Sequence, residues 1–417
     1  MLLSMETTVR VSDTEANIIN HMGYSAYKLW NVCNYERRNY DASSGVPYPD
    51  WYVQKAGHKD DHWYKSLPSQ SAQEICKQLD KAWKSYFALL KSGGIVNPRP
   101  PRFKHDPVPV TYMQNGMKRL SKNTVRFSIP KALKKHMSER YNIHDKYLYI
   151  ENPIFDNMDV IKQIRLYMPK DGVMRMIVVY EVPDREFLPD NGRYLSIDLG
   201  VHNLLTCVDS FGCGSFIVGR QYLSITRFYD KGIARIQGRW AEQQVKRGVK
   251  HPGPSRHVLD LYTKKRHCVN DYLHKVTRYI ADYCRDHHIH TVVIGDLTGI
   301  RKNKDLGDRI NQELHTLPYR KVIMLLKYKL ALYGIRLIAI SEAYSSKCSP
   351  QSPSVCKKYA SGSNRIKRRL YMDNGVIWNA DSVGAYNILR IYLEEQGVCI
   401  PLSSKGLSSP KIIKVAV

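Results

Sequence analysis

The spacing of hydrophobic residues changes along the chain, and each change predicts a different kind of element. Residues 4–10 are typical of a strand, and residues 69–92 repeat apolar side chains every three or four positions, as an amphipathic helix does. Short alternating runs between Pro, Asn, Asp and Gly fill residues 109–185 and predict β-strands. After residue 190 the pattern changes to three short strands and then longer elements. These are strands over 292–294 and 335–341 and helices near 222–247, 256–287, 318–333 and 380–396.

These patterns predict two lobes of different architecture. Hairpins followed by alternating helices and strands form a mixed sheet with helices on its faces. The short strands of 109–185 predict a small barrel or sheet domain, which the strand at 4–10 can close. Between them lie a Tyr- and Trp-rich segment and the helix at 69–92. Aromatic residues of that segment either stack on bases or fill a core, and we favour the core: Trp51, Tyr52, Trp63 and Tyr64.

The charge of the chain indicates a polyanionic partner. Its 417 residues carry 64 Lys and Arg against 38 Asp and Glu, a net charge of +26. Such an excess would repel itself in a compact fold, whereas each phosphate that it neutralises releases counterions. We therefore expect nucleic-acid binding. No apolar run is long enough to cross a membrane, the N-terminus is too polar for a signal peptide, and nine scattered Cys suggest reduced thiols in a cytosol.

Acidic residues stand at the ends of the predicted strands in the C-terminal lobe. Asp198 ends the strand in "YLSIDLG", and Asp296 follows the strand in "TVVIGDLTGIR". Asp381 begins the helix in "IWNADSVGAYNILR". A charge at the end of an apolar strand is costly without a cationic partner, so these acids are candidates for catalysis. The alternatives are a turn residue for Asp198 and a helix N-cap for Asp381.

The combination of D-x-G after the first strand and D-x-x-G-A-x-N-I at a helix start resembles the RuvC-like nuclease domain of the transposon-encoded TnpB (OrfB) proteins, relatives of type V CRISPR effectors. The segments "GDLTGIR", "ISEAYSSKCSP" and "GLSSPK" also look like that family, most strongly over 190–392. The resemblance implies a bilobed fold of α/β plus β-barrel class. Its expected parts are a wedge with an oligonucleotide-binding-like barrel (1–20 and 105–190), a helical recognition domain (21–104), an RNase H-like RuvC domain (191–344 and 376–399), a target-nucleic-acid-binding insert that is a degenerate zinc-finger region (345–375), and a flexible tail (400–417).

The same resemblance implies an RNA-guided DNA endonuclease. Proteins of the family bind an RNA made from their own transposon end, read a short DNA motif beside the target, and cut DNA. RNase H-type hydrolysis uses two Mg²⁺ ions about 4 Å apart, held by converging carboxylates. Asp198 matches the first acid of the family's Asp, Glu, Asp set and Asp381 the third. The usual Glu of the second position is Gly295 here.

Three interpretations of the second acid follow. Asp296 replaces it, although neighbouring side chains of a strand point to opposite faces. Alternatively, the acid has moved to Glu342, which ends the next strand beside the same sheet edge and is our preferred catalytic and metal-binding residue. In the third, no second acid exists and the protein only binds DNA. A surface salt bridge is the competing role for Glu342.

Basic residues outside the acids are candidates for nucleic-acid contact. The stiff Pro/Arg segment at 97–106 projects Arg99, Arg102 and Lys104, with a solvated linker as the alternative. The insert adds Arg365, Lys367, Arg368 and Arg369, which an ordinary solvated charge run also explains. Cys348 and Cys356 have no second pair or His, so we expect no zinc there, since tetrahedral zinc takes four ligands.

The partners expected are therefore a guide RNA and target double-stranded DNA, with one chain on one RNA and no membrane. The expected location is the prokaryotic cytoplasm, associated with the nucleoid. The alternatives are a nuclease-dead RNA-guided DNA-binding repressor, a compact type V CRISPR effector, a structural RNA-binding protein and a strand-joining transposase.

Overall fold

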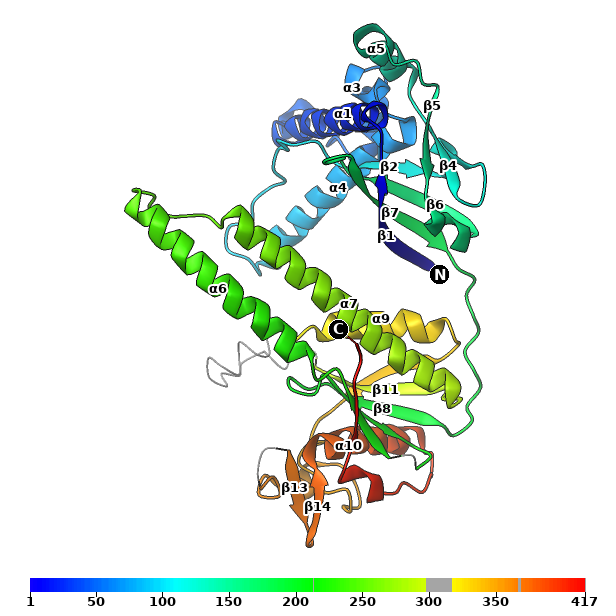
Figure 1. Cartoon of the computed structure of the whole chain (residues 1–417), viewed down its shortest axis with the longest axis vertical. Coiled ribbons are helices and arrows are strands. Elements are labelled where there is room, and N and C mark those ends of the chain that lie inside the picture. Colours follow the sequence, from blue (N-terminus) through cyan, green and yellow to red (C-terminus); the bar gives the residue numbers. More distant parts are fainter. Residues whose placement is uncertain (213, 298–316, 367–368, 417) are drawn as a thin grey trace. The chain divides into compact units, whose positions relative to one another are not determined.

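The structure, a computed structural model, describes residues 1–212, 214–297, 317–366 and 369–416. It divides into two compact units, Met1–Pro183 and Asp184–Val417 (Figure 1). No helix among the described residues is long and apolar enough to cross a membrane.

Unit 1 combines helices with two antiparallel sheets. One sheet has the strand order β1-β7-β6-β2 and the other β3-β4-β5. The predicted N-terminal strand pairs with β7 along its whole length. The strands are paired as two separate sheets, so a closed barrel stays a prediction. The elements are β1 (Leu2–Arg10), α1 (Asp13–Arg38), α2 (Trp51–Gly57), α3 (His62–Lys65), α4 (Ser69–Ser92), β2 (Val110–Met113), β3 (Met117–Arg119), β4 (Thr124–Ser128), α5 (Lys131–Tyr141), β5 (Tyr147–Glu151), β6 (Val160–Leu166) and β7 (Val173–Glu181).

A buried polar network joins the helices of unit 1. The guanidinium of Arg37 on α1 donates to Gln54 on α2 (2.8 Å) and to Asp80 on α4 (3.1 Å). His58 contacts the carboxylates of Glu36 and Asp61. Because Arg37, Gln54, His58 and Asp80 are all buried, these polar contacts fix how the helices pack.

Two features of α4 show which part of it packs into the core. The residue before its first turn is Pro68, and no side chain of the described residues caps the helix. Phe87 and Leu90 are exposed near its C-terminal end, whereas Leu79 is fully buried. The N-terminal part of the predicted apolar stripe therefore supplies the core.

Unit 2 is built on a six-stranded sheet in the order β12-β11-β8-β9-β10-β15. The strands β12, β11 and β8 are parallel, while β9 is antiparallel to both β8 and β10. Helices α7 and α9 cover one face of the sheet and α10 covers the other (Figure 1). The elements are β8 (Tyr194–Asp198), β9 (Leu205–Asp209), β10 (Ser215–Val218), α6 (Tyr222–Lys246), α7 (Arg256–Asp286), β11 (Thr291–Asp296), α9 (Tyr319–Ala331), β12 (Arg336–Ser341), β13 (Leu370–Asp373), β14 (Val376–Asn379), α10 (Ala380–Gln396) and β15 (Lys411–Ile413).

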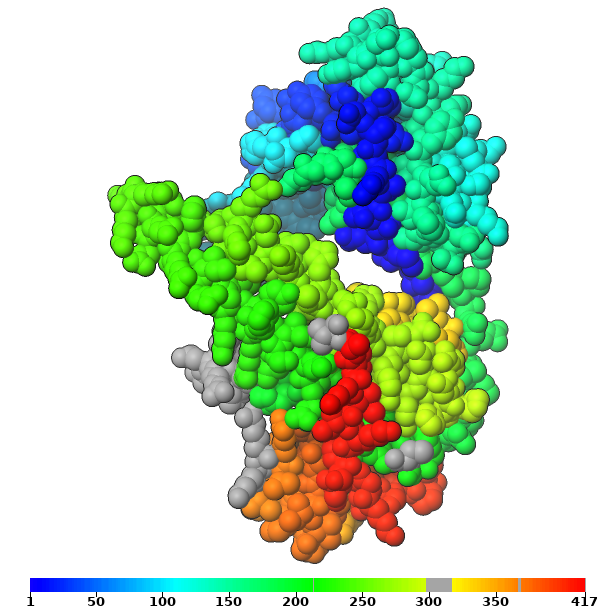
Figure 2. Space-filling view, viewed as in Figure 1, coloured from blue at the N-terminus to red at the C-terminus, as the bar shows by residue number. Residues whose placement is uncertain are grey.

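Part of the C-terminal tail is held by the sheet, which corrects the expectation of a flexible segment over 400–417. β15 pairs in parallel with β10, and the short turn before it buries Leu407. Figure 2 shows these C-terminal residues as a band across the visible face of unit 2. The strand satisfies the backbone groups of β10, which would otherwise be an open edge.

Candidate functional site

The carboxyl ends of three neighbouring parallel strands meet at one edge of the sheet of unit 2. β8 ends at Asp198, β11 at Asp296, and Glu342 follows the last residue of β12. The register pairs Ile197 with Ile294 and Gly295 with Ile340, so these ends lie at similar height. Open α/β sheets bind ligands at this edge.

Asp198 is half-buried and lies against α10. The helix can approach because residue 384 is Gly: a Cβ there would lie 2.8 Å from Oδ2 of Asp198. Ser196, two residues earlier, donates its hydroxyl to the carbonyl of Ala385 (2.7 Å) and fixes the same approach. Burial raises the pKa of Asp198 to about 8, helped by the charges of Glu342 and Asp381. These carboxylates therefore interact with one another.

Glu342 occupies the space beside Gly295. A Cβ built on Gly295 would lie 2.5 Å from Oε2 of Glu342 and 3.1 Å from Cδ1 of Ile388. Burial raises the pKa of Glu342 to about 7, and the charge of Asp296 adds to this shift. The carboxylate of Glu342 thus lies where the side chain of the missing glutamate would begin.

Asp296 lies differently. It is exposed at the end of β11, and Gly295, its neighbour in the strand, faces Glu342. Because successive strand residues point to opposite faces, we expect Asp296 to point away from the side on which Gly295 faces Glu342. The negative charge of Asp296 affects the site because it contributes to the raised pKa of Glu342.

Asp381 is the second residue of α10, and Asn379 is the N-cap, so Asp381 is not the cap itself. Asn203, in the turn after β8, donates its amide Nδ2 to Oδ2 of Asp381 (2.7 Å). The oxygen of the same amide, Oδ1 of Asn203, is buried and has no hydrogen-bond partner in the part of the chain that the structure describes. A buried oxygen without a donor beside a carboxylate indicates that a cation or a water belongs there.

The donor set fits a hard divalent cation. It consists of carboxylate and amide oxygens, which Mg²⁺ prefers, and the raised pKa values of Asp198 and Glu342 report a negative charge that a cation would relieve. Among the described residues, no three His, Cys, Asp or Glu side chains already surround a single metal position. The acids are brought to one region and coupled by charge, and a closed set of ligands around an ion stays a prediction.

The basic residues predicted for the insert have different surroundings. Arg365 is exposed, and its charge opposes the rise in the pKa of Asp198. Arg369 is exposed and has φ +74°, in the left-handed region. Lys367 and Arg368 lie outside the described residues. The thiol of Cys348 donates a hydrogen bond to the carbonyl of Cys356 (3.3 Å), and this contact holds the loop. Among the described residues, no group of three His, Cys, Asp or Glu side chains could hold a metal ion there.

The predicted linker of unit 1 is attached to α1 by its backbone. Trp30 donates to the carbonyl of Arg102 (3.2 Å), and Asn31 donates to that of Lys104 (2.8 Å). The side chains of Arg99, Arg102 and Lys104 are exposed. A fixed backbone with exposed cations suits phosphate contact, which nothing in the structure tests directly.

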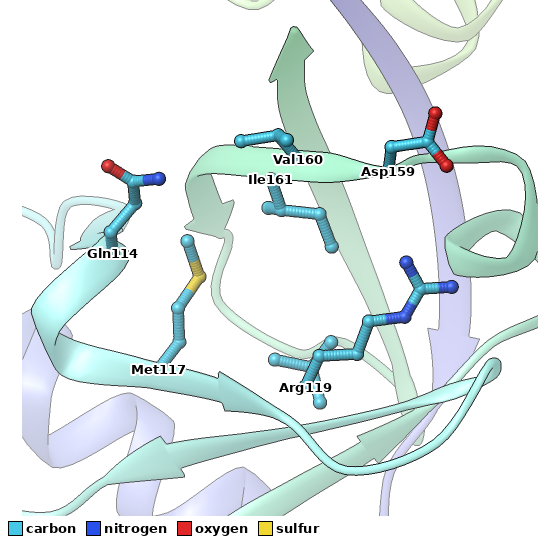
Figure 3. A pocket seen from close by; sticks show the side chains of 7 residues that line it. Gln114, Met117, Arg119, Asp159, Val160 and Ile161 are labelled. Atoms are coloured by element: carbon cyan, nitrogen blue, oxygen red, sulfur yellow. The ribbon is translucent and has the colours of Figure 1, made fainter.

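A cavity of about 270 Å³ in unit 1 has a different character (Figure 3). Met117, Val160 and Ile161 line it with Arg119 and Asp159. Arg119 donates to the carbonyls of Ser121, Lys122, Phe155 and Met158. Its guanidinium is therefore used to hold loops, and this cavity carries no chemistry of its own.

Sequence reasoning missed Asn203 and Gly384. Asn203 lies five residues after Asp198 in "DLGVHN", so a search for polar residues in the turn that leaves the first acid could have found it. Gly384 lies in the quoted D-x-x-G motif, but only the three-dimensional contact with Asp198 gives it a role.

Two segments of the chain match known protein families. Residues 177–301 match OrfB_IS605, described as a probable transposase, and residues 319–388 match the Cas12f1-like TNB domain. No curated protein sequence matches the chain.

Solved structures are similar to the chain at low identity. The Cas12f1–sgRNA–target DNA complex is 14% identical, with 90% of this chain and 83% of that chain covered and a TM-score of 0.60. A Cas12f ternary complex is also 14% identical, with 94% and 82% covered and a TM-score of 0.39. CasPhi-2 (Cas12j) bound to crRNA and phosphorothioate DNA is 10% identical, with 96% and 93% covered and a TM-score of 0.44.

The strand order and the similarity to the Cas12f1 structure define the class of fold: the chain has the fold of a type V-like effector. Within that class, the resemblance to the TnpB (OrfB) family is confirmed by the two matched segments.

Proposed function

We propose that this chain is an RNA-guided DNA endonuclease in which Asp198, Glu342 and Asp381 are the catalytic acids. The observation that supports it most is the shared space of Gly295 and Glu342. A side chain at position 295 and the carboxylate of Glu342 exclude each other, so β12 supplies the acid that β11 lacks. A decayed site would have no reason to keep a partly buried carboxylate whose pKa is raised to about 7.

The residues that would hold the metal are the three acids, with Oδ1 of Asn203 as a further oxygen ligand. When bound, a pair of Mg²⁺ ions supplies an activated water and charge stabilisation for the leaving oxygen. The chain itself positions these ligands. Asn203 holds Asp381 through its amide, and Gly384 lets α10 bring Asp381 to the end of β8.

The proposed partners are a guide RNA and target double-stranded DNA. The Cas12f1 structure that shares this fold was determined with sgRNA and target DNA. A net charge of +26 suits a guide–target duplex, which such proteins grip by its backbone while base pairing supplies the sequence. We assign phosphate contacts to Arg99, Arg102 and Lys104 in unit 1 and to the insert at 345–375, which lies within the matched TNB segment.

The test begins with co-expression of the protein and the DNA that flanks its gene. The RNA that copurifies is sequenced, and a plasmid library with the matching target beside randomised bases is incubated with the complex and Mg²⁺. We expect double-strand cleavage next to one short motif. Asp198→Ala and Glu342→Gln should abolish cleavage and retain RNA binding, and Glu395→Gln, an exposed acid on α10, is the matched control.

The outcomes separate the alternatives. Target binding without cleavage by the unaltered complex would support the nuclease-dead repressor instead. Cleavage that survives Glu342→Gln but not Asp296→Asn would move the second acid to Asp296. A complex that holds RNA and ignores matching DNA would refute target recognition altogether.

A further inference from the structure

Two buried thiols interact with each other in unit 1, where α1 packs against α4. Cys33 on α1 and Cys76 on α4 are fully buried free thiols, and each affects the other's ionisation. One turn further along each helix, Arg37 and Asp80 form the buried ion pair described above (3.1 Å). Residues four positions apart lie on the same face of a helix. The thiols and the ion pair therefore form one line of contact between the helices, the α1–α4 seam.

The surroundings of these thiols differ from those of an ordinary buried cysteine. The side-chain hydrogen bond with Cys33 lowers the pKa of Cys76, and the positive charges of His58 and Arg37 act in the same direction against burial. The same hydrogen bond, together with burial, raises the pKa of Cys33. Cys76 is therefore the sulfur that ionises, and Cys33 is the one that keeps its proton. A thiolate beside cations is the nucleophile of thiol chemistry, whereas a thiol in apolar surroundings is inert.

Unit 2 contains a buried pair of the inert kind. Cys207 on β9 and Cys284 on α7 are also fully buried, and they lie close enough for the charge of Cys284 to affect Cys207. Burial raises the pKa of both thiols, and among the described residues no cation offsets either shift. The two pairs are alike in burial and differ in their charged neighbours. The pair in unit 2 is therefore a control that the chain itself provides.

A single helical turn covers the thiols of the seam. α3 has four residues, and no side chain of the described residues caps it. Its buried Tyr64 lies near enough to be affected by the charge of both Cys33 and Cys76. A helix of one turn has little stability of its own, so this cover opens more readily than the long helices do. A small oxidant such as hydrogen peroxide can reach the sulfurs through such an opening.

The seam also holds the segment at 97–106, to which we assigned phosphate contacts. Asn34, the residue after Cys33, accepts from the indole N–H of Trp83 on α4 (2.9 Å). The amide of Asn34 donates to the carbonyl of Pro101 (3.0 Å). One side chain of the seam thus connects α1, α4 and the segment. A covalent bond between the helices at Cys33 would fix the surface that holds this segment.

We propose that Cys33 and Cys76 are a redox-active pair, in which peroxide forms a reversible disulfide that locks the α1–α4 seam. The thiolate of Cys76 attacks one peroxide oxygen: an S–O bond forms, the O–O bond breaks, and the leaving hydroxide takes up the proton that Cys76 released. The sulfur of Cys33 then attacks the sulfenic acid, so that the S–S bond forms and the S–O bond breaks. The hydroxyl leaves with the proton of Cys33 as water. Two thiols lose two electrons, and one peroxide becomes two waters.

The first experiment uses the unaltered full chain. Reduced protein is treated with increasing hydrogen peroxide, free thiols are blocked with N-ethylmaleimide in denaturant, and unreduced peptides are identified by mass spectrometry. We expect a cross-linked peptide pair that joins Cys33 to Cys76 and disappears with dithiothreitol. Cys207 and Cys284 should remain fully alkylated at the same peroxide concentration. The exposed Cys399 reports that the oxidant was active.

The second experiment identifies the sulfur that reacts first. Cys33→Ser leaves Cys76 without a second thiol, so its sulfenic acid should accumulate and be labelled by dimedone. Cys76→Ser should give no dimedone adduct at Cys33, because that thiol keeps its proton. A melting curve of each variant before oxidation confirms that it is folded, and the first experiment needs no variant.

The third experiment measures the lock. Calorimetry compares the reduced, oxidised and re-reduced chain. A disulfide that closes a loop of this length should raise the melting temperature of unit 1 by roughly 5–10 °C, and re-reduction should reverse the rise. Oxidised Cys33→Ser, which cannot form the bond, should melt like its reduced form.

Four results would overturn the proposal. They are Cys33 and Cys76 that stay alkylated while Cys399 is oxidised, equal cross-linking of Cys207 to Cys284, dimedone on Cys33 in place of Cys76, and a disulfide that leaves the melting temperature unchanged. None of them bears on the nuclease proposal, because these experiments need neither RNA nor DNA. A chain that forms the cross-link and never cleaves would support the redox pair and count against the nuclease alone.

Discussion

Gly295→Ala is the sharpest perturbation of the proposed site, because it adds one methyl group where Glu342 already lies. The new Cβ would be 2.5 Å from Oε2 of Glu342, and ordinary contact begins near 3.4 Å. The carboxylate would have to retreat by about 1 Å, a misplacement that can cost about 100-fold in rate. Contact with Cδ1 of Ile388 at 3.1 Å adds overpacking, so we expect a loss of about 1–3 kcal/mol of stability.

The assay pairs thermal unfolding with single-turnover cleavage of target plasmid. Two second-site variants separate the causes. Gly295→Ala/Glu342→Ala should recover part of the stability, because the clash with Glu342 is gone while the contact with Ile388 remains, and it should stay inactive. Gly295→Glu/Glu342→Gly should recover part of the cleavage, because it places a carboxylate in the same space from β11. Gly362→Ala is the matched control, since a Cβ at that position meets nothing within 4 Å.

A Gly295→Ala protein that cleaves and unfolds like the unaltered chain would refute this reasoning. It would mean that Glu342 is free to leave the space beside position 295 at no cost. An inactive Gly295→Glu/Glu342→Gly protein with normal stability would show that Glu342 acts from a place that β11 cannot reach.

Three further predictions concern stability. Glu36, and after it Asp61, raise the pKa of His58 to about 9 against the effect of burial, so the charged imidazole stabilises unit 1 fully below pH 6.5 and this contribution is lost as the pH rises through 9. His58→Gln should flatten that pH dependence in urea unfolding. Arg37→Leu should cost about 3 kcal/mol by the same measurement, because the buried carboxylate of Asp80 loses its buried partner and keeps the exposed Lys84. Deletion of residues 411–417 should lower the melting temperature by about 2–6 °C, because β10 loses its parallel neighbour; an unchanged melting curve would contradict the role of β15.

Periodicity in the sequence was enough to predict the long elements of unit 2. The expected helices near 222–247 and 256–287 match α6 and α7 within one residue, since long amphipathic patterns leave little ambiguity. These expectations succeed because each depends on local spacing.

Contacts between distant segments were harder to predict. β15 has three residues, too short a run to show a periodic pattern, and it exists only because β10 offers an open edge. The first helix, α1, was not predicted, because tyrosines and charged residues interrupt the pattern of its apolar positions. A local signal was available: Ser12 and Glu15 form a capping box at its start. The role of Asn203 required knowing that the turn after β8 meets α10.

The proposed relocation of the second acid rests on the geometry of parallel strands. β11 and β12 are adjacent and in parallel register, so a side chain at position 295 and one that follows β12 approach the same point from two directions. Phosphodiester hydrolysis by two metal ions needs a ligand oxygen at that point, and either strand can supply it. The space holds one carboxylate: with Glu342 present, even a methyl group at 295 clashes at 2.5 Å. In the proposed site, glycine at position 295 is therefore what permits Glu342 to act as the second acid.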